Sequence, residues 1–133
     1  LLMPMKLLTA EIIAAMPKER TTANLPNEKI PVICKFFLAD GGWTWYIAEA
    51  SLYTADGQEK ALRDTTEAER EDPNNDILMF GYIVSGLGSD CNELGTVSFN
   101  ELRSVKTRFN LGLERDIHFP VGTRMMSEFV TKR

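Results

Sequence analysis

Hydrophobic residues dominate two neighbouring stretches of the chain, residues 31–40 (PVICKFFLAD) and residues 43–51 (WTWYIAEAS), and only a few polar positions interrupt them. The pair Gly41-Gly42 separates the two stretches, and both are rich in β-branched and aromatic residues. Such stretches form strands, and a short glycine-rich segment between them forms a tight turn. The pattern therefore predicts a β-hairpin in the first half of the chain.

The second strand of this hairpin presents two different faces, because successive side chains of a strand point to opposite sides of the sheet. One face carries Trp43, Trp45 and Ile47, and the other carries Thr44, Tyr46 and Ala48. This spacing disfavours a single aromatic platform made of all three rings. We expect at least one tryptophan to lie in the core, which leaves the face of Tyr46 as the candidate contact surface.

The rest of the chain predicts further strands. Residues 76–88 (DILMFGYIVSGLG) are apolar enough for a central strand, in which Gly81 indicates a bulge or a close approach of two backbones. After a turn, residues 96–99 (TVSF) form a short fourth strand, and residues 114–119 (ERDIHF) form a short extended segment. The sheet is therefore expected to have four to five strands.

Two short helices complete the pattern. Residues 8–17 (LTAEIIAAMP) have an apolar face and begin after Thr9, a good N-cap residue. A second helix opens at Ser98, with Glu101 three residues later in the spacing of a capping box. The order of elements predicts an α+β fold, in which a small antiparallel sheet, a β-hairpin meander, is covered by two helices.

The segment 54–75 between the hairpin and the central strand is charged and has almost no apolar face. Beyond one or two helical turns it is expected to be a mobile loop insertion, since it is long for a connection in so small a domain. The whole chain, residues 1–133, is expected to be a single domain with its core at about residues 5–120. Residues 1–4 precede MKLLT, which has the form of a natural start.

Composition excludes some classes of protein. No apolar stretch reaches the roughly 18 residues of a membrane span. A signal peptide needs an uninterrupted apolar stretch near the N-terminus, and Glu11 interrupts that stretch here. Cys34 and Cys91 are distant from each other, so free cytosolic thiols are expected. These features predict a cytoplasmic protein without contact to a membrane.

The formal charge of −4 is unevenly distributed along the chain. Residues 56–76 hold eight acidic and three basic residues, a net charge of −5, whereas residues 103–133 hold seven basic and three acidic residues, a net charge of +4. Such a separation can steer a charged partner, and the acidic segment can occupy a basic groove. An ordinary solvated surface explains the same composition, so both interpretations stay open.

Several motifs in this order, WTWY, FGY, ELG and ERD, together with MKLLT, resemble a family of small uncharacterised proteins carried by plasmids, phages and conjugative elements. The resemblance implies a small standalone α+β domain, encoded near replication, partition or anti-restriction genes. It supplies no agreed activity and no catalytic residues. The segment 54–75 is longer than the family pattern, so a role for it is expected to be specific to this chain.

The usual catalytic motifs are missing from the sequence. His118 is the only histidine, there is no GxSxG nucleophile motif, and the glycines of GLGSDCNELG do not have the spacing of a phosphate-binding loop. The sequence therefore favours a protein without a cofactor that is not an enzyme. The expected binding surface consists of Tyr46, Glu49, Glu114, Arg115 and Asp116.

The sequence is also compatible with two alternatives. Glu49, Glu114 and Asp116, with His118 assisting, would bind a divalent metal for an enzyme acting on nucleic acid if the fold brought their oxygen atoms together.

The second alternative is a weak DNA-binding accessory factor. It would use basic residues of the second helix next to Phe109, namely Arg103, Lys106 and Arg108. The favoured hypothesis is an accessory binding protein of a mobile genetic element. It would act by stoichiometric contact with a host or element macromolecule, for example to counter host defence.

Overall fold

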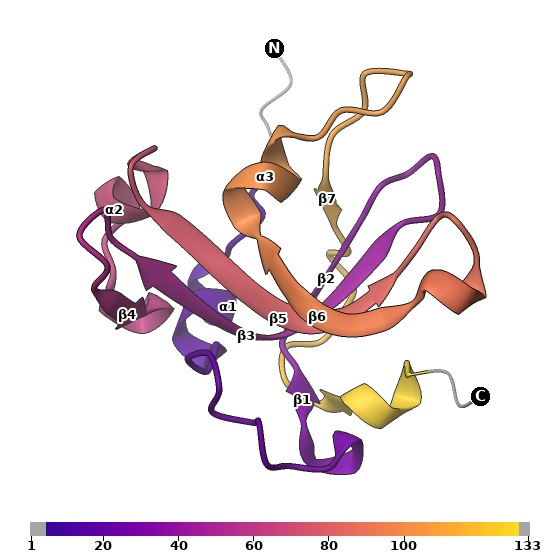
Figure 1. Ribbon diagram of the computed structural model, residues 1–133, viewed down its shortest axis with the longest axis horizontal. Coiled ribbons are helices and arrows are strands. Elements are labelled where there is room, and N and C mark those ends of the chain that lie inside the picture. Colours follow the sequence, from indigo (N-terminus) through magenta and orange to yellow (C-terminus); the bar gives the residue numbers. More distant parts are fainter. Residues whose placement is uncertain (1–4, 131–133) are drawn as a thin grey trace.

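The computed structural model describes residues 5–130, and residues 1–4 and 131–133 lie outside the described part. Its centre is a six-stranded antiparallel sheet with the order β6-β5-β3-β2-β7, in which β4 also pairs with β3 (Figure 1). The strands are β2 (Cys34–Phe37), β3 (Thr44–Tyr53), β4 (Glu59–Ala61), β5 (Asp76–Val84), β6 (Glu93–Ser98) and β7 (Glu114–Arg115). A second, two-stranded sheet joins β1 (Pro31–Val32) to β8 (Arg124–Met125).

Short helices connect these strands. The α-helices are α1 (Ala10–Ala15), α2 (Glu67–Glu71) and α3 (Phe99–Ser104), and the 3-10 helices are η1 (Asn27–Lys29), η2 (Leu62–Asp64), η3 (Ser89–Cys91) and η4 (Met126–Glu128). The predicted α+β class and antiparallel sheet are confirmed. The sheet holds six strands instead of the expected four to five, because β4, which has only three residues and lies inside the charged segment 54–75, was not predicted. The N-caps of α1 and α3 are the predicted Thr9 and Ser98.

The main core lies on the face of the sheet that carries Trp45, as predicted. Trp45 is buried, and Trp43, just before β3, stacks on it with ring centroids 5.8 Å apart. Ile12 of α1 belongs to the same hydrophobic cluster, as do Phe99 and Leu102 of α3. Both helices that were predicted from capping residues therefore contribute to one core.

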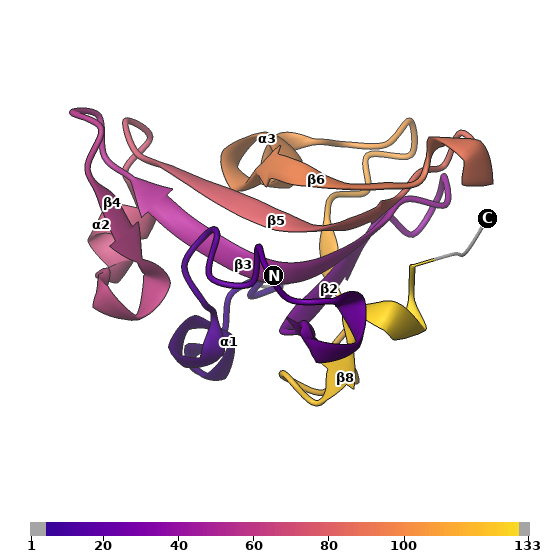
Figure 2. The same ribbon diagram turned by 60° about the horizontal axis from the view of Figure 1, so that its bottom comes forward.

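A second, smaller cluster lies on the opposite face of β3 and β5. Tyr82 is the register partner of Tyr46, and it is buried together with Ala48 and Met126 of η4. Figure 2 shows the C-terminal segment with β8 lying against one side of the sheet. The C-terminal residues therefore cover the face that the sequence pattern left open.

Close approach of backbones occurs at Gly81, as the sequence indicated. A Cβ atom on Gly81 would overlap the carbonyl oxygen of Tyr46 on the neighbouring strand. The pairing of β3 with β5 shifts by one residue between Ile47 and Glu49, directly beside this contact. The glycine thus permits a bulge in β3.

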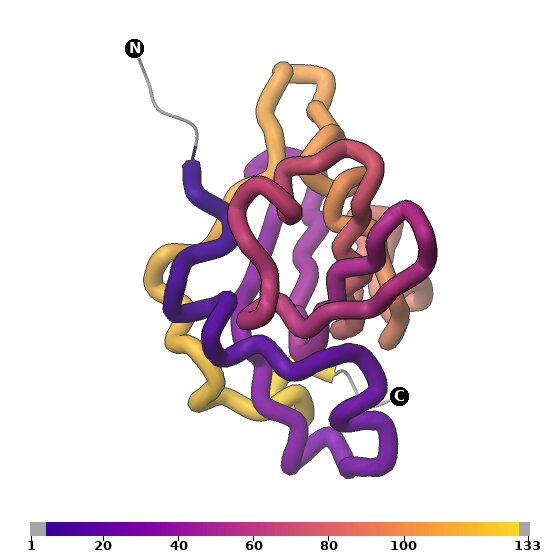
Figure 3. Tube along the Cα trace, turned by 90° about the vertical axis from the view of Figure 1, so that its left-hand side faces the viewer, coloured from indigo at the N-terminus to yellow at the C-terminus, as the bar shows by residue number. Residues whose placement is uncertain are grey.

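The acidic segment 54–75 is not a connection without structure of its own. It forms β4, η2 and α2, and it folds over one end of the sheet (Figure 3). Leu62 is completely buried in the main core, which the pattern did not reveal because a single apolar residue has no periodicity. The expected mobile loop insertion is therefore anchored to the core at Leu62.

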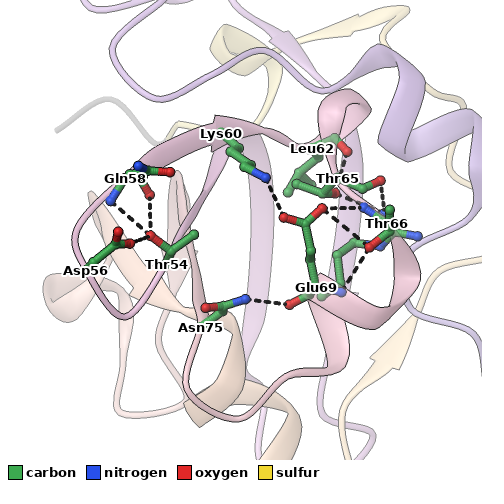
Figure 4. A network of polar contacts seen from close by, with 10 residues as sticks. Thr54, Asp56, Gln58, Lys60, Leu62, Thr65, Thr66, Glu69 and Asn75 are labelled. Carbon is green, nitrogen blue, oxygen red and sulfur yellow. Dashed lines mark hydrogen bonds and ion pairs between the residues drawn. The ribbon is translucent and has the colours of Figure 1, made fainter.

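Polar contacts hold this segment together (Figure 4). Thr66 caps α2, and its side chain and that of Glu69 form a reciprocal capping box. Glu69 also accepts the Lys60 ammonium at 2.5 Å, and its carbonyl oxygen accepts the Asn75 side-chain amide at 3.1 Å. These contacts tie α2 to β4 on one side and to the start of β5 on the other.

Candidate functional site

The motif ERD of residues 114–116 adds to the edge of the sheet beside β2. Arg115 pairs with Phe36 and Glu114 with Phe37, and the amide of Asp116 donates to the carbonyl oxygen of Lys35 at 2.9 Å. Two residues are too few to form a strand alone, so the existing edge of β2 positions them. The motif is therefore held in a fixed register.

A turn follows at Asp116. Its carboxylate accepts the amide of His118 at 3.0 Å, and its carbonyl oxygen accepts the amide of Phe119 at 3.2 Å. The turn leaves Ile117 with 61% of its surface exposed and His118 exposed beside it. Asp116 thus shapes a ridge, defined here as residues 116–118.

Lys35 connects the ridge to the face of Tyr46. Its Nζ atom lies 3.5 Å from the Asp116 carboxylate and 5.6 Å from the centre of the Tyr46 ring. Both partners of this ion pair are partly exposed, so solvent screens their attraction. Lys35 was not among the predicted residues, although its alternation with the buried Cys34 and Phe36 placed it on the face of Tyr46.

Tyr46 itself does not form an open contact surface. Its ring stacks on Phe129 with centroids 4.2 Å apart, and Phe119 lies against it at 6.3 Å. The guanidinium of Arg124 lies 4.8 Å from the centre of the Phe129 ring. The prediction for Tyr46 was incomplete, because residues distant in sequence half-bury its ring.

Glu49 was predicted on the binding surface, but its side chain is buried, with 3% of the residue exposed. Its carboxylate accepts the backbone amides of Arg20 at 2.7 Å and of Thr22 at 2.6 Å, and also the Thr22 hydroxyl. The prediction of a surface role was wrong. A buried carboxylate needs such donors, and here they fix the turn at residues 18–22.

The alternative metal site does not form. Among residues 5–130, no group of three or more histidine, cysteine, aspartate or glutamate side chains is placed to hold an ion. The donors around Glu49 occupy its oxygens away from Glu114 and Asp116, which lie on β7 and the ridge. The three carboxylates that would have shared a metal are therefore in two separate places.

The alternative nucleic-acid residues are also separated. Arg103 is engaged within the protein: it pairs with Glu71 at 3.2 Å, donates to the Asn100 side chain at 2.8 Å and lies over the Phe99 ring. Since α3 ends at Ser104, Lys106 and Arg108 lie beyond the helix. The prediction that Arg103 and Lys106 share one face of a helix was wrong. Of the three basic residues, Lys106 and Arg108 are exposed and Arg103 is partly buried.

An open groove of about 610 Å³ runs between the β2–β3 hairpin and the segment 114–118. Its lining combines apolar side chains with charges of both signs. These include Phe37, Leu38, Trp43, Lys35, Glu114 and Arg115. The Nε atom of Arg115 donates to the carbonyl oxygen of Lys6 at 2.9 Å, and Met5 of the same N-terminal segment also lines the groove.

A second hollow of about 490 Å³ lies on the other side of the same ridge, against α1. Cys34 lines it but is buried, and burial raises the pKa of its thiol to about 12. The thiol therefore stays protonated near neutral pH, which removes it as a nucleophile. The ridge with Ile117 separates the two hollows and is exposed to both.

Together the fold and the groove define a small α+β domain with a charged, partly apolar groove at one edge of an antiparallel sheet. Residues 52–132 match the family model described as Protein of unknown function (DUF2958), and the chain belongs to this family. The matched range includes the FGY, ELG and ERD motifs and the acidic segment, whereas WTWY lies before it. No curated protein and no solved structure matches the chain.

Within residues 5–130, none of the helices has the length and apolar character needed to cross a bilayer.

Proposed function

We propose that this chain is an accessory binding protein of a mobile genetic element, which acts in the cytoplasm by stoichiometric contact with a host or element protein rather than by catalysis. Its contact surface is the groove beside β7 together with the ridge at residues 116–118. The resemblance of its motifs to proteins carried by plasmids, phages and conjugative elements supports the assignment to a mobile genetic element. A protein of a mobile element would serve to counter host defence or to support maintenance of the element.

The composition of the groove carries this proposal, together with the strand pairing that positions one of its walls. Trp43 and Arg115 are residue types enriched at protein interfaces and at their energetic hot spots. Pairing of β7 with β2 fixes the groove wall before any partner arrives, which lowers the entropic cost of binding. A partner segment with apolar and charged side chains would match this lining.

Ile117 provides the sharpest test, because it is exposed on the ridge and contributes to neither hydrophobic cluster. Protein captured from host lysate by the wild type would be identified and purified. We expect Ile117→Glu to weaken its binding about tenfold or more, since a charge would enter a desolvated contact. The matched control is Leu25→Glu, which makes the same kind of change at an exposed residue of the segment 21–26.

Equal affinity of the wild type and both variants for the captured protein would contradict the groove as the contact surface. Circular dichroism of each variant establishes that the fold is kept. A deletion of the acidic segment is unsuitable for this purpose, because it would remove the buried Leu62 from the core.

A further inference from the structure

The loop between α3 and β7 is shaped by a tight turn. The amide of Asn110 donates to the carbonyl oxygen of Thr107 at 2.8 Å, and the amide of Thr107 donates to Leu111 at 2.9 Å. Asn110 has a φ of 61°, in the left-handed region that asparagine tolerates. In Figure 1 this loop extends away from the sheet at the top of the view. The turn therefore holds its tip residues away from the core.

Exposed apolar side chains gather on this loop. Phe109 has 62% of its surface exposed, Leu111 43% and Val105 39%. A single exposed apolar residue is ordinary, but three within seven residues next to a protruding turn indicate a contact site.

Cations without acidic partners accompany these side chains. The guanidinium of Arg108 lies 4.9 Å from the centre of the Phe109 ring, and Lys106 is exposed at the neck of the loop beside Gly112. Within residues 5–130, neither Lys106 nor Arg108 forms an ion pair, in contrast to Arg103. The sequence has no acidic residue between Glu101 and Glu114.

We propose that this loop binds single-stranded nucleic acid, with a base stacked on Phe109 and phosphates held by Lys106 and Arg108. An aromatic ring flanked by free cations is the arrangement that binds single strands without sequence preference. The site is separate from the groove of the proposed function and does not depend on it.

The acidic character of the whole chain does not oppose this site strongly. The acidic segment with α2 lies at the far left of Figure 1, away from the loop after α3. At physiological ionic strength, interactions between exposed charges are screened over about 8 Å. The local charge of the loop therefore governs its contact with phosphates.

A membrane surface is the competing partner for an apolar and basic loop. Even a whole myristoyl chain gives only marginal membrane binding, and three partly exposed side chains bury much less apolar surface. Stacking of one base on one aromatic ring, in contrast, changes affinity by roughly 5- to 150-fold. The loop thus fits a base better than a bilayer.

The test is fluorescence anisotropy with labelled oligo-dT at several salt concentrations, starting near 50 mM. Binding should weaken as salt rises, and Lys106→Ala and Arg108→Ala should each make the slope of log K against log salt shallower by about 0.7. Phe109→Ala should weaken binding roughly 5- to 150-fold with little change in slope. The matched control is Arg63→Ala, an exposed cation of η2.

The proposal is overturned if oligo-dT does not bind at the lowest salt, or if the three loop variants bind like Arg63→Ala. Binding to phosphatidylserine vesicles without binding to oligo-dT would assign the loop to a membrane instead. Ile117→Glu should bind oligo-dT like the wild type, so failure of this site and failure of the groove are distinguishable.

Discussion

At Gly81, strands β3 and β5 approach each other closely. A Cβ atom added to Gly81 would overlap backbone atoms of Tyr46 and not a side chain that could move aside. Backbone held by strand pairing on both flanks yields less easily than the end of a flexible side chain. Gly95, the register partner of Gly81 on β6, differs: a Cβ atom there would meet only the end of Ile83, at 3.6 Å. Two paired glycines therefore have opposite tolerance for a side chain.

We expect Gly81→Ala to destabilise the protein by about 3 kcal/mol, because overpacking forces backbone strands apart. Gly95→Ala should change stability by about 0.5 kcal/mol or less. Urea unfolding followed by tryptophan fluorescence measures both variants. Similar midpoints for the two would show that β3 and β5 have room to separate at the bulge.

Among the elements, the segment 54–75 departs most from its sequence pattern. Its charges predict solvent exposure, and most of its side chains are exposed, but Leu62 sits in the main core among residues of β3 and α1. The segment is therefore held by the buried side chains of Ala61 and Leu62, by pairing of β4 with β3 and by the contacts of Glu69.

Leu62→Ala should cost about 2–5 kcal/mol, the usual range for truncating a buried leucine. Its neighbour Arg63 is exposed, so Arg63→Ala should cost about 0.5 kcal/mol or less. Thermal unfolding of the two variants makes the comparison. If Leu62→Ala unfolds at the temperature of Arg63→Ala, the segment is not anchored as described.

Local patterns predicted the long strands and the capped helices, and they missed several of the shortest strands. The hairpin, β5, and the caps at Thr9 and Ser98 follow from alternation and from single capping residues. Strands of two or three residues, such as β4 and β8, are too short to have a period and form only because another strand is present, whereas β7 lies inside the predicted extended segment 114–119. Pattern alone therefore could not set the number of strands.

The candidate site shows the same division. Glu114, Arg115 and Asp116 were predicted as a surface, and the structure places them on the groove and ridge. Glu49 was misplaced because its donors come from residues 20 and 22, on a turn whose position no local pattern reveals. Covering of Tyr46 by Phe129 likewise depends on contacts between distant parts of the chain.

For the whole molecule, the response to acid depends on three glutamates with lowered pKa values. Hydrogen bonding by Ser51, followed by Arg20, lowers the pKa of Glu59, the Lys60 ammonium lowers that of Glu69, and the backbone amide of Met125 lowers that of Glu128. The contacts of Glu59 and Glu69 hold the acidic segment, and those of Glu128 lie near the C-terminus. Protonation at low pH therefore weakens contacts in both regions. A lowered folded pKa stabilises the fold above the unfolded pKa and loses this effect as the pH falls.

Stability should therefore decline as the pH drops below about 4.3, the ordinary pKa of a glutamate. Glu59→Gln should be less stable than the wild type at pH 7 and should lose less stability between pH 7 and pH 3, because its side chain cannot gain a proton. Urea midpoints measured across this range test both statements. An equal loss in the variant and the wild type would mean that the contacts of Glu59 do not contribute to acid sensitivity.

The clamp of Glu49 on the turn at residues 18–22 has a consequence for synthesis on the ribosome. Glu49 follows Arg20 by 29 residues, and the residues of β3 and η2 that share the core with α1 lie between Trp45 and Leu62. The chain emerges from its N-terminus, so α1 and this turn leave the exit tunnel well before the carboxylate and strands that hold them. The rate of translation across β3 and the acidic segment thus determines how long α1 of the nascent chain remains without the residues on which it packs.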